Sequence, residues 1–389
     1  MQAGEGQAAA PEMDSHVGRP RLSLTTTVAC SVPTVHWLSA HQEAEWDDFV
    51  TSHPLGLVYH LSAWRRVLED AFPHIRGQFL VSRNGADGRI HAGLPIYTVA
   101  SWLLGNRVSS VPFASFCDPL ISSAEDFRQL LPELEGLHQR TKSRRLEVRV
   151  NKLVDQLSQS PLLRSSGYKH HYLSLEKSNE ELLSSFAKSS IRQKMTKASK
   201  EGVTVEERED EGGMDICHSI LEETRSRLAL PVLPYQFFQA MRRWLWPKHL
   251  KVFVGMQQGK PVAFHLILKF KDLWISEYSG DSSQAMSGVN QLVYWETMKR
   301  AKQQGATCFS FGRTSATNEG LLAYKRRWSP VEEDLAEFSL AAPGQDKEAE
   351  SKPRAREDSA AYKLVRLVLA KAPKPVYRMI GDYCYRHLG

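Results

Sequence analysis

The sequence is poor in cysteine, and the few cysteines it has are scattered. Its 389 residues contain five, Cys30, Cys117, Cys217, Cys308 and Cys384, and no two of them form a C-x-x-C pair. An odd and dispersed set predicts neither a disulfide framework nor a zinc site. We therefore predict no metal site, and we expect the protein in a reducing, cytoplasmic compartment.

Long apolar runs are also missing. The longest candidate, residues 96–116, is interrupted by Asn106, Arg107 and Pro112. This length and composition predict no transmembrane helix. The first sixteen residues contain no apolar core of the kind found in secretory signals, so we expect no signal peptide.

Familiar catalytic signatures are absent as well. The sequence contains no G-x-S-x-G, H-E-x-x-H or G-x-x-x-x-G-K-[ST] motif. His170 and His171 precede a predicted strand, where adjacent side chains point to opposite faces. This pair is a poor metal clamp, and we interpret both residues as surface imidazoles.

The composition that remains favours a two-domain protein with an anionic partner. Hydrophobic residues make up 42% of the chain, the net charge is +6 and the isoelectric point is about 8.9. That length and apolar content can fill two cores. The mild positive charge favours a phosphorylated substrate, a tRNA or an acidic membrane face, but it is too weak for a dedicated DNA-binding protein.

One order of predicted elements occurs twice along the chain, which predicts a tandem of one α/β module. The expected elements of the first copy are helices from Ser39 and over 61–70, strands 79–82, 90–99 and 108–113, a helix 125–140 and a strand 145–150. Those of the second copy are helices 179–200, 214–229 and 234–245, strands 251–256, 261–270 and 273–280, a helix 289–305 and a strand 306–311.

Composition shifts mark the expected domain boundaries. We predict a disordered leader (1–33), a first domain (34–175), a second domain (176–340) that carries catalysis, a charged linker (341–358) and a C-terminal helical segment (359–389). The last segment alternates apolar and basic residues. We interpret it as helices docked on the body, with attachment to an anionic membrane surface as the alternative.

Three segments of the second domain point to chemistry. The stretch 188–200 holds Arg192, Lys194 and three more lysines with no acid. It is either a solvated helix face or a cationic wall for phosphate or tRNA. A Ser- and Gly-rich loop then precedes the helix at Val289, whose free amides can bind an anion.

The third segment runs from Phe309 to Pro330. The strand pattern stops at Gly312 and Arg313, at the kind of strand end where open α/β sheets bind ligands. Lys325 follows Tyr324 and lies near Trp328, and such aromatic shielding would keep a cation partly dry and able to stabilise negative charge. The alternative is a helix-end lysine that interacts with the helix dipole.

The order of several segments resembles the FemAB-like branch of the GNAT acyltransferase superfamily. The segments are WDDFV and AWRRVLEDAF, VPFASFCDPL, IRQKMTKASKEGV, LALPVLPYQFF, RAKQQGATCFSFGR and AYKRRW. The resemblance spans about 35–340 and is strongest over 185–330. The combination is similar to members found beside exopolysaccharide and exosortase loci.

This resemblance implies an α/β (α+β) fold of two GNAT-like modules, each a mixed central sheet flanked by helices. It also implies transfer of an acyl or aminoacyl group to an amine of a cell-envelope precursor. No cofactor is expected to stay bound, and acyl-CoA or aminoacyl-tRNA would be the donor substrate. The family's Phe-Lys element matches Tyr324–Lys325, and its Gly-Arg element matches Gly312–Arg313.

We assign site residues on this basis. Lys325 would stabilise the oxyanion of the tetrahedral intermediate, Arg313 would hold an anionic group of the substrate, and Glu277 or Asp281 would receive the amine proton. The alternative for these two acids is that they are loop-facing carboxylates without a catalytic role. Substrate contacts are expected from Tyr278, Tyr324, Arg192, Lys194 and Asn290. The acyl-CoA loop Q/R-x-x-G-x-G/A is degenerate, since Gln284, Ser287 and Gly288 remain but the spacing is one residue too long.

The sequence thus predicts a cytoplasmic N-acyltransferase or aminoacyltransferase. Its acceptor would be an anionic envelope or exopolysaccharide precursor that is nucleotide- or lipid-linked. A tRNA and a peripheral contact with the inner face of the membrane are further candidate partners. The competing hypothesis is a non-catalytic tRNA- or polyanion-binding module of the same fold.

Overall fold

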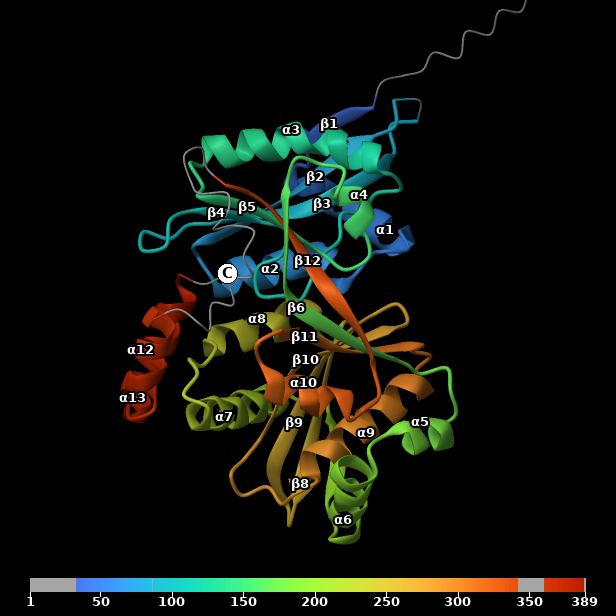
Figure 1. The fold of residues 1–389 in the computed structure, drawn as a ribbon, viewed down its shortest axis with the longest axis vertical. Coiled ribbons are helices and arrows are strands. Elements are labelled where there is room, and N and C mark those ends of the chain that lie inside the picture. Colours follow the sequence, from blue (N-terminus) through green and yellow to red (C-terminus); the bar gives the residue numbers. More distant parts are fainter. Residues whose placement is uncertain (1–32, 86, 342–359, 388–389) are drawn as a thin grey trace, which may run out of the picture.

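The computed structural model of the chain describes residues 33–85, 87–341 and 360–387. Apart from Pro33 and Ala341, the predicted leader (1–33) and linker (341–358) lie outside these residues. Within the described part, helices and strands alternate in an α/β arrangement (Figure 1), as the sequence predicts.

The first half of the chain supplies six strands. Its elements are β1 (Thr34–Trp37), η1 (Ala40–Gln42), α1 (Glu43–Ser52), η2 (Val58–His60), α2 (Ser62–Ala71), β2 (Ile75–Arg83), β3 (Ile90–Val99), β4 (Arg107–Ser109), α3 (Ala124–Arg140), β5 (Arg145–Val150), α4 (Val154–Leu157) and β6 (Leu163–Ser174).

The second half repeats this order after a helical connection. The connection consists of α5 (Asn179–Ser185), the π-helical η3 (Lys188–Gln193) and α6 (Lys194–Lys200). The repeat consists of β7 (Thr204–Arg208), α7 (Gly212–Arg227), α8 (Tyr235–Leu245), β8 (Leu250–Gln257), β9 (Lys260–Phe270), β10 (Leu273–Asp281), α9 (Val289–Gln303), β11 (Cys308–Ser315), α10 (Glu319–Arg326) and β12 (Val331–Ala341). Each half therefore runs strand, two helices, three strands, helix, strand, short helix, strand.

The twelve strands of the described residues form one sheet, because the two halves exchange their last strands. The strand order is β1-β2-β3-β4-β5-β12-β6-β11-β10-β9-β8-β7. β12 lies between β5 and β6, and β6 lies between β12 and β11, all antiparallel. The two strands cross the middle of the molecule side by side (Figure 1). The mixed sheets predicted for the two modules are thus continuous with each other.

Helices cover both faces of this sheet. In the first half α3 buries one face with leucines such as Leu130 and Leu134, and α1 and α2 bury the other. That second core continues into α7 and α8, and α2 packs against α8. In the second half α9, together with α5 and α6, covers the opposite face around Trp295 and Trp328.

Two predicted elements differ from the structure. The predicted strand 108–113 is only Arg107–Ser109, because the chain leaves the sheet at Pro112, which has no N–H for a ladder. The predicted helix 179–200 is broken after Ser185. There Phe186 adopts an extended backbone and buries its ring against Trp295 and Trp328, at centroid distances of 5.7 and 5.1 Å.

The C-terminal segment folds as α12 (Ala360–Leu369) and α13 (Lys374–Tyr385), which lie against α7 and the loop after it. The Tyr377 hydroxyl donates to the Leu230 carbonyl (2.6 Å), and Arg378 pairs with Glu222 (2.8 Å). Gly381 allows close approach, since a Cβ there would lie 2.7 Å from the Val232 carbonyl oxygen. No helix in the described residues is long and apolar enough to cross a bilayer.

The close packing of α13 predicts that glycine-to-alanine substitutions in two helices change the free energy of unfolding in opposite directions. Glycine to alanine in a helix normally stabilises by about 0.5–1 kcal/mol, and we expect this for Gly136→Ala in α3, where the new methyl group meets only the flexible Arg140 end. We expect Gly381→Ala to destabilise by about 1–3 kcal/mol, because the methyl group meets backbone. Thermal unfolding measures the first difference, and limited proteolysis of 360–387 measures release of α13. Equal stabilisation by both substitutions would contradict this packing.

Candidate active site

The sheet opens between β10 and β11. These parallel strands pair only from Leu273–Cys308 to Ile275–Ser310, although both continue. Beyond that point β10 stays paired with β9, and β11 stays paired with β6. The two strands therefore separate beyond Ile275 and Ser310, and their facing backbone edges no longer pair with each other. We call this gap between β10 and β11 the parting. Such a parting can admit an extended ligand.

A β-bulge lies on each side of the parting. Glu277 is the extra residue of β10, and the register of β11 shifts between Ser310 and Arg313 at Gly312, whose φ is +68°. Bulges are common next to active sites because they redirect side chains. The predicted strand end at Gly312–Arg313 is wrong, since β11 bends there and continues to Ser315.

Glu277 is the carboxylate at the parting. Burial raises its pKa to about 7, against the lowering effects of a hydrogen bond from Tyr59 and of the nearby Arg313 charge. The Tyr59 hydroxyl donates to Glu277 Oε2 at 2.5 Å, and Tyr59 itself is fully buried. A carboxylate with this pKa can gain or lose a proton near neutral pH, which suits a general base.

Tyr59 comes from η2 in the first half and is held there by its neighbours. Trp46 donates its indole N–H to the His60 carbonyl (2.6 Å). His60 Nδ1 accepts from the Leu57 amide, so its Nε2 carries the proton and donates to the Asp118 carbonyl (2.8 Å). These bonds fix η2 against the 111–118 loop, and with it the tyrosine that reaches Glu277.

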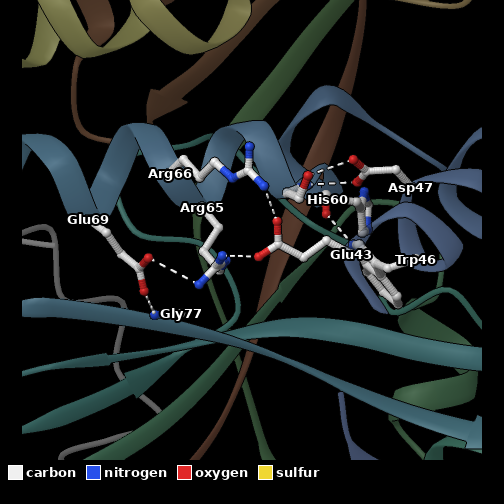
Figure 2. Close-up of polar contacts among 9 residues, drawn as sticks. Glu43, Trp46, Asp47, His60, Arg65, Arg66, Glu69 and Gly77 are labelled. Carbon is white, nitrogen blue, oxygen red and sulfur yellow. Dashed lines mark hydrogen bonds and ion pairs between the residues drawn. The ribbon is translucent and has the colours of Figure 1, made fainter. Parts of the chain in front are cut away.

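A polar network also joins α1 to α2, the two helices that precede and follow η2 in the chain (Figure 2). Asp47 accepts from the amide and the hydroxyl of Ser62 at 2.8 and 2.6 Å, which holds the start of α2. Glu43 accepts from both Arg65 and Arg66. Because η2 lies between these two helices, their pairing limits the freedom of Tyr59.

Arg313 stands across the parting on β11. Its guanidinium lies over the Tyr168 ring, 4.7 Å from the centroid, and its amide donates to Ser115 Oγ at 3.2 Å. Its charge lowers the pKa of Glu277. Arg313 therefore forms one electrostatic group with Glu277 and Tyr59, and residues of both halves contribute to this group.

Lys325 reaches the bulge of β11 from the last turn of α10. Its Nζ donates to the carbonyls of Gly312 (3.0 Å) and Arg313 (3.2 Å). Only 6% of the residue is exposed, and burial lowers its pKa to about 7. Lys325 does lie in the last turn of α10, as the helix-end alternative expects, but its side chain is buried and not exposed there. The structural alternative is a clamp on the bulge, formed by the same two hydrogen bonds.

The interpretation of His170 and His171 as surface imidazoles is also wrong. Both are buried in β6, and burial lowers both pKa values, that of His170 to about 3. They do point to opposite faces. His170 Nε2 bonds Ser310 Oγ at 2.8 Å on one face, and His171 bonds Glu332 on the other.

The loop before α9 brings the expected donor-binding residues close to α6. Gly288, with φ +106°, packs so tightly on Lys194 that a Cβ would lie 2.1 Å from the Lys194 carbonyl oxygen. Gln284 and Ser287 are exposed in this loop. Asn290, in the first turn of α9, has a buried Oδ1 without a hydrogen-bond partner in the described residues.

The other predicted site residues lie in η3, α10 and β10. Arg192 is half-buried in η3, and its Nε has no hydrogen-bond partner among the residues described. Tyr324 packs edge-on to Tyr294, 6.4 Å between centroids. Tyr278 lies in the core against Phe237 and Phe238 of α8. Asp281 is ion-paired with Arg227 at 2.8 Å.

The first half has an equivalent gap beside β5, and residues 110–118 of the chain fill it. β4 and β5 are also parallel and also stop pairing after three residues. The chain then runs alongside β5, where the Cys117 amide donates to the Arg149 carbonyl (3.0 Å). Asp118 accepts from the amides of residues 151–153. This segment fills the first-half parting, in contrast to the parting beside Glu277.

Sequence reasoning missed the residues that the first half contributes. Tyr59, Ser115 and Tyr168 are separated from their partners by 145 to 218 positions. Of the three, only Ser115 lies in a segment that carries the resemblance, VPFASFCDPL, and its contact with Arg313 was not predicted. Two surface cavities of about 390 and 580 Å³ lie beside α13, and neither is lined by Glu277, Arg313 or Lys325.

Comparison with known proteins agrees with this architecture. Residues 185–326, from the end of α5 to the end of α10, match the model of the Acetyltransferase (GNAT) domain. No curated protein matches the chain significantly.

Solved structures give a longer match. FemX superimposes with a TM-score of 0.64 at 16% identity, over 79% of this chain and 97% of FemX. The C-terminal domain of a putative lysylphosphatidylglycerol synthetase from Agrobacterium fabrum gives 0.52 at 14%, over 85% and 97%. A tandem GNAT protein from the clavulanic acid biosynthesis pathway gives 0.53 at 10%, over 81% and 100%. At these identities the likeness establishes the fold, a tandem GNAT-like arrangement whose second half matches the GNAT domain model.

Proposed function

We propose that the protein is an N-acyltransferase or aminoacyltransferase that modifies an amine of a cell-envelope or exopolysaccharide precursor. The observation that carries the proposal is the pair of groups with pKa values near 7, Glu277 and Lys325, at the bulges on the two sides of the open parting. The GNAT match over 185–326 and the tandem GNAT-like fold support the reaction class.

The proposed reaction starts with the acceptor amine attacking the carbonyl carbon of the donor. Glu277 takes the proton that the amine nitrogen loses. Lys325, as an ammonium group, stabilises the oxyanion of the tetrahedral intermediate. The intermediate then collapses, and the C–S bond of a thioester or the C–O bond of an aminoacyl ester breaks. The leaving sulfur or oxygen takes the proton that Glu277 accepted, which restores the carboxylate. Arg313 holds an anionic group of the acceptor.

Within this proposal the base is Glu277 rather than Asp281. Asp281 is partly exposed and paired with Arg227. Glu277 has a pKa raised to about 7 by burial, so it is both present as a base near neutral pH and strong enough to accept a proton. Tyr59 and Arg313 act on Glu277, and Tyr59 is a positioning residue.

The donor is acyl-CoA or aminoacyl-tRNA, and it would bind along the parting and the loop before α9. That loop contains Gln284, Ser287 and Gly288, and next to it lie Lys194 and Asn290. Lys188, Lys197 and Lys200 are exposed on η3 and α6, which suits a phosphate-rich donor and also the competing hypothesis of a tRNA- or polyanion-binding module. We place the protein in the cytoplasm, at the inner face of the membrane.

A transfer assay separates the two hypotheses. The purified protein is incubated with radiolabelled acetyl-CoA or with aminoacylated bulk tRNA, and with amine-bearing nucleotide-linked or lipid-linked sugar precursors. Radiolabel on an acceptor amine supports the proposal. Salt-sensitive tRNA binding without labelled product would support the binding module and contradict the enzyme.

We expect a bell-shaped pH dependence of kcat, with both limbs near pH 7. The rate rises with pH as Glu277 loses its proton, and it falls as Lys325 loses its own. Glu277→Gln should lower kcat about a hundredfold to ten-thousandfold and abolish the acidic limb. If Asp281→Asn has this effect instead, the base is Asp281 and the assignment to Glu277 fails.

Tyr59→Phe should move the acidic limb to higher pH. In the native protein the hydrogen bond from Tyr59 lowers the pKa of Glu277. Without this bond the pKa of Glu277 should rise further. The maximum of the bell should therefore move to higher pH and become lower, because Lys325 still loses its proton near pH 7. A purely structural role of Tyr59 would lower the rate at every pH and leave the limb in place.

Lys325→Met should lower kcat on the order of a hundredfold to a thousandfold, the usual cost of losing one oxyanion donor. The matched control is Arg326→Met, which removes an exposed cation of the same helical turn that pairs with Glu332. Circular dichroism and the KM of each substrate accompany the assay. A folded Lys325→Met variant with near-normal kcat would leave the lysine only its role as a clamp on the bulge.

A further inference from the structure

Three large apolar side chains in succession are exposed at the turn between β3 and β4. They are Trp102, Leu103 and Leu104, and 80% of Trp102 is exposed. Exposed runs of this kind are unfavourable in water unless they serve a function. The turn is held in shape, since the Leu104 amide donates to Ser101 Oγ at 2.9 Å. It is therefore a fixed apolar tip.

A second exposed apolar row lies beside this tip on α13. Val376, Met379 and Tyr383 follow at helical spacing on the face opposite to the docked residues Tyr377 and Tyr385, and 64% of Met379 is exposed. On the preceding helix α12, Leu367 and Val368 are exposed as well. α13 thus has one apolar face that packs on α7 and another that has no cover in the described residues.

The two exposed features form one surface. The His387 ring contacts Trp102 at 5.3 Å and Tyr383 at 5.0 Å between centroids, and Ser101 Oγ bonds His387 Nδ1 at 2.9 Å. In Figure 1 the β3–β4 turn and the α12–α13 pair lie on the same flank of the molecule. We call Trp102, Leu103, Leu104, Val376, Met379 and Tyr383 the docking face.

The charge around the docking face is positive. Residues 360–387 contain six lysines and arginines and a single acid, Asp382. Lys371, Lys374 and Arg386 are exposed, and Lys142 and Arg144 are exposed near the tip, where the Arg144 amide donates to the Asn106 carbonyl at 2.8 Å. Exposed apolar and aromatic groups within a basic rim match an anionic bilayer, in whose interface Trp and Tyr are favoured.

We propose that the docking face binds the surface of an anionic lipid bilayer. It deepens the proposed function, on which it rests, because a lipid-linked acceptor would be presented at that surface. A second copy of the chain is the weaker occupant, since a twofold contact would bring the same basic rims together. The binding test below uses no donor and no acceptor, so its outcome is independent of whether transfer occurs.

The experiment is co-sedimentation of the full chain with vesicles of phosphatidylcholine, with and without phosphatidylglycerol. We expect binding to the anionic vesicles that weakens as salt is raised. Lys371→Gln with Lys374→Gln should lower the affinity roughly twenty-five-fold, since each basic residue near an anionic surface contributes about fivefold. The matched control is Arg89→Gln with Lys260→Gln, two exposed cations at other turns.

The apolar contribution is tested separately. Trp102→Ser with Leu103→Ser should lower binding at least tenfold, whereas Val331→Ser, which changes an exposed apolar residue of β12, should not. Thermal unfolding confirms that the variants remain folded, and light scattering reports the oligomeric state. Absence of binding, equal binding to neutral vesicles, or binding unchanged in both double variants would overturn the proposal. A dimer that Trp102→Ser dissociates, without vesicle binding, would assign the face to a second copy.

Discussion

The pairing of β6 with β12 is the constraint on which the rest of the molecule depends. These strands form eight residue pairs, from Val331–Tyr172 to Ser339–Leu163. The other neighbour of β6 is β11 of the second half, and the other neighbour of β12 is β5 of the first half. The exchange makes one sheet of two repeats. It also fixes β6 beside β11, so that Tyr168 lies under Arg313 and His170 bonds Ser310.

This junction explains how the first half can serve the second. Its own parting is filled by the segment that carries Ser115 and Asp118, and the same segment holds Arg313 and His60. η2 then projects Tyr59 onto Glu277. In this account, one repeat keeps an open parting for chemistry, and the other has become a scaffold that sets the pKa and position of its acidic group.

The sequence predicted elements whose pattern is local. The helix 125–140 and the hairpin strands around residues 79–99 follow from periodicity and turn residues, and they occur nearly as expected. The strand exchange could not be predicted, because β5 and β12 are far apart in sequence and several partners fit each strand. Tyr59 was missed for the same reason. The aromatic neighbours of Lys325 did indicate a partly dry cation, which agrees with its burial. The burial of both histidines depends on packing, which no local residue pattern reports.

The central claim is that acyl transfer takes place at the parting between β10 and β11. A crystal structure with a hydrolysis-resistant acetyl-CoA analogue, and one with an amide-linked analogue of the aminoacylated 3′-terminal adenosine, would test it most directly. The account predicts that one of the two analogues lies along the parting, with its carbonyl oxygen toward Lys325 Nζ and its carbonyl carbon facing Glu277. Both analogues bound elsewhere, or a carbonyl group turned away from these two side chains, would contradict it.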